Sequence, residues 1–92
     1  MQSRLDRSGV IKELKNVLDR ATEGRIIPFM VGEHTDVIDE LGVDSLNQLE
    51  IRFEIERVWN LEITDRQVRS LRTIGQAADL IIQLAVHEEE MV

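Results

Sequence analysis

Apolar residues recur at helical spacing in the first part of the chain. Between residues 10 and 21 an apolar face alternates with a face of charged and amide side chains, which predicts an amphipathic helix. Ser8 is placed to cap this helix at its start. Gly24 is placed to end it, because glycine adopts left-handed backbone at little cost.

A second periodic stretch begins at Asp44 or Ser45 and runs to about Trp59, where Asn60 is a suitable terminator. One apolar stripe is expected to face the core: Ile51, Ile55, Val58 and Trp59. A neighbouring stripe holds Leu46, Leu49 and Phe53. We therefore expect one long helix with two adjacent apolar faces.

The third part of the chain contains two further helix starts. Residues 61–63 alternate apolar and polar and predict a short extended link. Thr64 followed by Gln67, and Thr73 followed by Gln76, each match the capping box, in which the two side chains bond each other's backbone amides. A brief helix with Val68 and Leu71 as apolar contacts is expected first. A long helix follows it, with this inner face: Ile74, Ala77, Ala78, Ile81, Leu84 and Ala85.

The connection over residues 25–44 is long and opens with an apolar patch at residues 26–31. Pro28 and Gly32 interrupt it, and no second strand is available for pairing, so we expect a loop that lays apolar side chains over the bundle. Thr35 or Asp36 is expected to cap a single turn that brings these side chains to the core: Val37, Ile38 and Leu41.

These elements predict an all-α four-helix bundle of three long helices and one short one, with a long loop between helices 1 and 2. Residues 1–92 are expected to form a single domain, with an ordered core at about 8–86 and loose ends at 1–7 and 87–92. With 92 residues we expect one modest core, without room for a separate catalytic domain and a cofactor domain.

Charge and composition narrow the partners of this bundle. The net charge of −7 argues against nucleic acid or an anionic membrane as the main partner, since both attract Lys and Arg clusters. The absence of cysteine excludes disulfides and thiolate metal sites, and we expect no metal site of any other kind. No apolar run reaches the length of a membrane span, and no signal peptide is evident, so we expect a cytoplasmic protein. We also expect it to be a monomer.

The most informative stretch is Leu41-Gly42-Val43-Asp44-Ser45-Leu46, where a loop turns into a helix. This run, followed by NQLEIRFEIERVWNLEIT and DRQVRSLRTIGQAADLI, resembles the acyl carrier proteins and related peptidyl carriers. The resemblance covers about residues 36–82. Asp-Ser-Leu alone is common, and the preceding Leu-Gly and the helices behind it make the match specific.

The resemblance implies a carrier and not an enzyme. It implies that 4′-phosphopantetheine is attached to Ser45 by a phosphopantetheinyl transferase, and that the arm's thiol holds acyl groups as thioesters. Gly42, Asp44 and Leu46 are the motif neighbours of Ser45. A phosphodiester at a helix amino end is favoured by about 0.3–1 kcal/mol when exposed, so the expected setting suits this group.

The resemblance also implies that synthase, acyltransferase or acyl-activating enzymes dock on the second helix. Leu46, Leu49 and Phe53 are expected either to meet these partners or line an acyl groove, or to be ordinary core residues. Charged side chains on a helix usually form a solvated face, but the resemblance favours docking roles for Glu50 and Glu56.

Several positions depart from the pattern of general fatty-acid carriers. Arg52 and Arg57 lie on a helix that is more uniformly acidic in those carriers. Glu54 takes a position that is usually small or apolar there, and residues 24–33 are longer and more apolar. These departures indicate a specialised fatty-acid, polyketide or lipid pathway.

Other functions compete with this interpretation. The cargo can be aminoacyl or peptidyl instead of acyl, since the sequence names neither the cargo nor the pathway. An acidic helical adaptor without a prosthetic group is a further alternative, and Asp44 with Ser45 is also an ordinary helix cap. A hydrolase using Ser45 lacks a nearby base and the Gly-x-Ser-x-Gly elbow.

Overall fold

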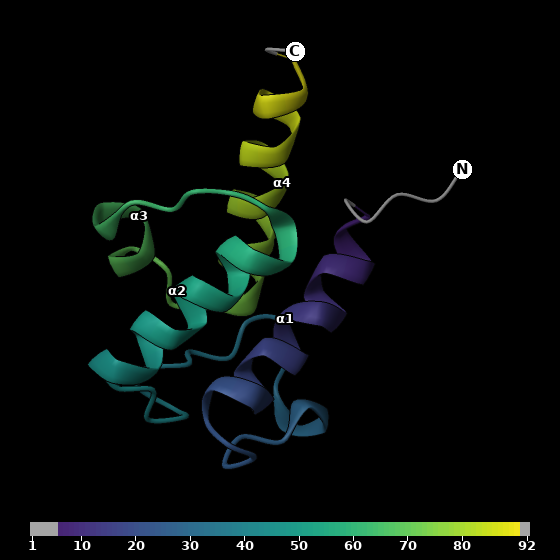
Figure 1. Cartoon of the computed structure of the whole chain (residues 1–92). Coiled ribbons are helices and arrows are strands. Elements are labelled where there is room, and N and C mark those ends of the chain that lie inside the picture. Colours follow the sequence, from purple (N-terminus) through teal and green to yellow (C-terminus); the bar gives the residue numbers. More distant parts are fainter. Residues whose placement is uncertain (1–5, 91–92) are drawn as a thin grey trace.

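The structure, a computed structural model, describes residues 6–90 and is built from helices (Figure 1). In chain order they are α1 (Arg7–Ala21), the 3₁₀ turn η1 (Pro28–Met30), α2 (Ser45–Trp59), α3 (Asp65–Arg69) and α4 (Ile74–Glu90). No strand occurs among the described residues, where a single β-bridge joins Asp36 to Thr73. The predicted all-α bundle, with one short helix and a long first connection, is confirmed.

The ends of the bundle differ from the expected core of 8–86. α1 begins at Arg7, and α4 continues to Glu90, four residues beyond the expected end. The rest of the predicted loose ends, residues 1–5 and 91–92, lies outside the described residues. None of the helices within residues 6–90 combines the length and apolar character that a membrane crossing requires.

The core consists mainly of aliphatic side chains between α1, α2 and α4. α1 packs against both α2 and α4 (Figure 1). The buried members are Val10, Leu14, Val17, Leu18, Ile26, Val31, Val43, Ile55, Trp59, Leu61, Ile63, Ile74, Ala77, Ala78 and Ile81. The predicted inner faces of α2 and α4 are confirmed, with these predicted members only partly buried: Ile51, Val58, Leu84 and Ala85.

Local hydrogen bonds set the helix boundaries. Both predicted capping boxes are present, since Thr64 accepts from the Gln67 amide and Thr73 from the Gln76 amide, each at 3.1 Å. The prediction that Ser8 caps α1 is wrong. The Asp6 carbonyl accepts a hydrogen bond from the Val10 amide at 2.9 Å, so the first turn forms before Ser8.

The ends of α1 and α2 follow the expected turn chemistry. Gly24, after α1, has a φ of 81°, and its amide donates to the Asp19 carbonyl at 2.9 Å. Asn60 caps α2 in the left-handed conformation, with a φ of 56°. In the link that follows, Leu61 and Ile63 are buried and Glu62 is exposed, so the predicted alternation is confirmed.

Only part of the apolar patch at residues 26–31 is buried in the core. Ile26 and Val31 are buried at its two ends. Between them Ile27, Phe29 and Met30 are 53%, 92% and 71% exposed, so the expectation that the loop lays this whole patch over the bundle is wrong. The chain turns tightly in η1, so the two flanking residues reach the core while the residues between them face solvent.

A second turn in this connection carries apolar side chains back to the core. Asp36 caps it, because its carboxylate accepts the amides of Ile38 at 2.9 Å and Asp39 at 2.8 Å. The bond from the Asp39 amide, with those from Arg72 and the Ile38 amide, holds the pKa of Asp36 below its usual value. Val37 and Leu41 pack against the core, as expected, whereas Ile38 is half-buried and is not among these core contacts. This turn places residues 42–44 directly before α2.

Candidate functional site at the amino end of α2

Ser45 is the first residue of α2, and its side chain is exposed. The chain reaches it through Gly42, whose φ of 71° lies in the left-handed region that glycine adopts without strain. Val43 follows with its side chain buried, which anchors the segment to the core. The hydroxyl of Ser45 is therefore presented to solvent from a fixed helix end.

Asp44 caps this helix through its side chain. Its carboxylate accepts the Asn47 amide at 2.8 Å, and the Asn47 side-chain oxygen accepts the Asp44 amide at 3.4 Å, which completes a capping box. Because the Asp44 carboxylate is directed to the backbone, it is not aimed at the Ser45 hydroxyl as a base. The predicted cap and the exposed serine thus coexist on adjacent residues.

Two long-range contacts tie this helix end to α1 and the turn after it. Arg25 Nη2 donates to Asn47 Oδ1 at 2.8 Å, and Asn47 Nδ2 donates to the Ala21 carbonyl at 3.3 Å. Neither contact was predicted from the sequence. Arg25 lies 22 positions before Asn47, and no local pattern connects them.

The electrostatics of this end suit a negatively charged group. The backbone amides of Asn47 and Gln48 both donate to oxygens of Asp44. The amides of Ser45 and Leu46 lie in the first turn, where the helix itself offers no acceptor. The partial positive charge of a helix amino end favours an anion there. The Arg25 guanidinium adds a full positive charge beside it. An exposed hydroxyl in this setting can carry a phosphate ester.

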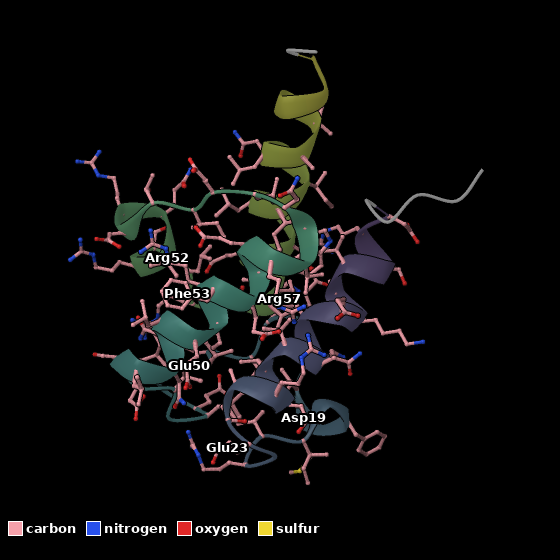
Figure 2. All side chains as sticks on the ribbon, viewed as in Figure 1. Asp19, Glu23, Glu50, Arg52, Phe53 and Arg57 are labelled. Carbon is pink, nitrogen blue, oxygen red and sulfur yellow. The ribbon has the colours of Figure 1, made fainter. Side chains whose placement is uncertain are left out.

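An apolar stripe continues from Ser45 along the exposed side of α2. Leu46, Leu49 and Phe53 are 64%, 43% and 58% exposed, so they are not core residues. We call these three residues the exposed stripe. Figure 2 shows Phe53 and Glu50 on α2. A group of exposed apolar side chains is typical of a surface that other proteins contact.

The acidic residues of α2 differ in their partners. Glu50 is exposed, and it takes part in none of the ion pairs among the described residues. Glu54 pairs with Arg57 at 2.8 Å and with Arg20 of α1 at 3.1 Å. The hydrogen bonds from Arg57 and then Arg20 lower the pKa of Glu54. Glu54 therefore joins α2 to α1.

Glu56 also serves the fold. Its Oε2 accepts the Ile63 amide at 2.9 Å and lies 3.6 Å from Arg52 Nε, which fixes the link that follows α2. Arg52 pairs in addition with Asp65 of α3. The side chain of Glu56 is 25% exposed, and its carboxylate already has partners within the chain. Its docking role stays a prediction.

A small apolar cavity of about 50 Å³ lies behind the inner face of α2. Its lining comes from all four α-helices and the connections between them: Leu14, Leu18, Val37, Ile38, Val43, Gln48, Ile51, Ile55, Val68, Leu71, Arg72, Thr73, Ile74 and Ala77. The lining does not include the exposed stripe. The sequence pattern marked Ile51 and Ile55 as inward, and helical periodicity alone cannot show that a gap remains between packed helices.

The chain is similar to known carriers over most of its length. A family model described as a phosphopantetheine attachment site matches residues 9–81. The acyl carrier protein of Streptomyces coelicolor is 33% identical over 78 residues, which cover 85% of this chain and 84% of the relative. That of Coprothermobacter proteolyticus is 27% identical over 78 residues, covering 84% and 92%. That of Tropheryma whipplei is 42% identical over 45 residues, covering 49% and 55%.

The matched residues 9–81 run from within α1 through α2 and α3 into α4, and they contain the exposed serine with its helix cap. Proteins of this kind interact with phosphopantetheinyl transferases and synthase enzymes, and they perform no catalysis themselves. The residues at the amino end of α2 fit the phosphate of the prosthetic group. The chain therefore belongs to the acyl carrier protein family, whose members carry a covalently attached 4′-phosphopantetheine.

Proposed function

We propose that Ser45 carries the 4′-phosphopantetheine and that the chain delivers acyl thioesters on this arm to partner enzymes. The observation that supports the proposal best is the exposure of Ser45 as the first residue of a capped helix. The Ser45 oxygen forms a bond to the phosphorus of coenzyme A that bears the pantetheine. The pyrophosphate bond breaks, adenosine 3′,5′-bisphosphate leaves, and the transferase takes the hydroxyl proton.

The cavity behind α2 favours an acyl cargo over an aminoacyl one. Its lining is almost entirely apolar, so an alkyl chain that enters it loses no hydrogen bonds. The charged ammonium of an aminoacyl group would lose its hydration there without a carboxylate partner in the lining. Aminoacyl or peptidyl cargo is the alternative. Methyl NMR of Ile55 and Leu71 separates the two, because only a cargo that enters the cavity shifts both.

The exposed stripe and Glu50 are the proposed docking surface for the transferase and the acyl-handling enzymes. Glu54 and Glu56 have partners within the chain, and Arg57 is exposed on the same helix. α2 therefore offers fewer unpaired acids than the acidic helix that general fatty-acid carriers have. We propose on this basis that the chain serves a dedicated fatty-acid, polyketide or lipid pathway with its own partners.

The attachment site is tested by mass spectrometry of the unmodified protein after incubation with coenzyme A, Mg²⁺ and a broad-specificity phosphopantetheinyl transferase. Wild type should gain the mass of one phosphopantetheine group, and Ser45→Ala should gain nothing. Ser70→Ala is the matched control, because Ser70 is also exposed at a helix end and should be dispensable. No gain in wild type would refute the proposal and favour the adaptor alternative. An equal gain in Ser45→Ala would refute Ser45 as the attachment residue.

A further inference from the structure

The Arg25 side chain lies beside the amino end of α2, and no carboxylate of residues 6–90 pairs with it. None of the ion pairs formed among the described residues includes it. Among the described residues, Arg25 forms one side-chain hydrogen bond, in which Nη2 donates to the neutral Asn47 Oδ1 at 2.8 Å. A guanidinium has five donors, so most of the donors of Arg25 remain available to a ligand.

Short contacts place this guanidinium close to the attachment residue. Asn47 Oδ1, which accepts from Arg25 at 2.8 Å, also accepts from the Asp44 amide at 3.4 Å. Asp44 directly precedes Ser45. On its other side, Arg25 Nη1 lies 4.0 Å from the position that a Cβ at Gly42 would occupy. The cation therefore lies alongside the backbone that leads into the modified residue.

We propose that Arg25 holds the phosphodiester of the phosphopantetheine arm after its attachment. This inference rests on the proposed function of Ser45. The phosphodiester keeps one negative charge at neutral pH, and it would lie between Arg25 and the first amides of α2. Hydrogen bonds from arginine to phosphate are charge-assisted and often bidentate, which makes them stronger and more directional than neutral ones.

The other arginines near α2 are less suited to this role. Arg52 is paired with Asp65 and Glu56, and Arg57 is paired with Glu54. Both lie at least seven residues along α2 from Ser45, which is about two helical turns. Arg25 combines an available charge with proximity to the helix start. It would direct the first atoms of the arm toward the turn after α1.

Phosphorus NMR of the modified protein tests this proposal. Raising NaCl from about 0.1 M to about 1 M shortens the Debye length from about 10 Å to about 3 Å, so the wild-type resonance should move as the contact weakens. Arg25→Gln should lose most of that movement. Arg57→Gln should keep that movement, because Arg57 is an exposed arginine of α2 that lies away from Ser45.

A second readout needs no variant. In wild type, the Nε–H resonance of Arg25 should shift when the unmodified protein is converted to the modified form. The proposal is overturned if this resonance stays in place, or if Arg25→Gln keeps the salt-dependent movement of the phosphorus resonance. Either result is distinct from a failure of the proposed function, because that failure appears as the absence of a phosphopantetheine mass gain in wild type.

Discussion

The two halves of α2 use their side chains differently. In the amino half, Ser45–Phe53, the hydroxyl of Ser45 and the exposed stripe face solvent. In the carboxyl half, Glu54–Trp59, Ile55 and Trp59 are 1% and 4% exposed. Glu54 pairs with Arg20 of α1, and Glu56 accepts the amide of Ile63. In one continuous helix, the carboxyl half is thus anchored to the core and the amino half exposes its side chains to solvent.

The difference shows how a small bundle can stabilise a site without enclosing it. Burial of large apolar side chains contributes about 1.5–3 kcal/mol each, and α2 concentrates its fully buried side chains in the carboxyl half. The amino half is held by polar contacts, namely the local Asp44 cap and the long-range contact of Asn47 with α1. The exposed stripe therefore remains accessible to solvent.

The largest expected effect comes from truncating the anchor of the carboxyl half. Trp59→Ala should lower the free energy of unfolding by about 3–5 kcal/mol, because it leaves a cavity in the core. The measurement is urea unfolding followed by far-ultraviolet circular dichroism, since Trp59 is the only tryptophan and its fluorescence is lost. If Trp59→Ala proves too unstable to unfold reversibly, Trp59→Phe should show a smaller loss. A loss of stability no larger than that of Phe53→Ala would contradict the claim that the carboxyl half of α2 anchors the helix to the core.

A smaller effect should appear when Glu54 is neutralised. Its pKa is lowered by hydrogen bonds from Arg57 and then Arg20, so the ionised form stabilises the folded state. This contribution is fully present above the unfolded pKa of about 4.3 and disappears as pH falls through the folded value. At pH 7, Glu54→Gln should cost about 0.2–1 kcal/mol, as partly exposed ion pairs do.

The pH dependence of unfolding checks the Glu54 prediction. The difference between wild type and Glu54→Gln should shrink toward zero as pH is lowered below about 4. Glu50→Gln is the matched control, because Glu50 is an exposed glutamate of the amino half without an ion pair among the described residues. A difference that is independent of pH, or equal in the Glu50 variant, would contradict the role of Glu54 as an anchor.

The smallest effect on stability is expected in the amino half. Phe53→Ala should change the free energy of unfolding by less than about 0.5 kcal/mol, because its side chain is already 58% exposed. It should instead raise the KM of the transferase about fivefold, which corresponds to the loss of about 1 kcal/mol from a docking contact. Kinetics with unmodified protein as the varied substrate would show this. An unchanged KM together with lost stability would reverse the roles of the two halves.

The sequence predicts the features that depend on residues close together in the chain. The capping boxes at Thr64 and Thr73 join side chains and amides three positions apart. Helical periodicity likewise identified Ile55 and Trp59 as buried. The motif around Ser45, the proposed attachment residue, was recognisable because its loop, cap and helix are contiguous.

Features that depend on distant residues were not predictable in this way. Exposure of Phe29 and Met30 depends on whether another element covers them, and apolar character alone suggested burial. The contact of Arg25 with Asn47 joins separate elements. The bond of Glu56 to the Ile63 amide likewise forms only once the link after α2 folds back on that helix, and the docking role of Glu56 stays a prediction. Local pattern therefore gives the helices, and packing decides which of their faces remain free.

The most direct test of the central claim is fragmentation mass spectrometry of the modified protein, which assigns the added group to one residue. The account predicts that every fragment carrying the phosphopantetheine mass contains Ser45, and that the group maps to that hydroxyl alone. Localisation to Ser8 or Ser70, which are also exposed, or a wild-type protein that accepts no group from any transferase would contradict it.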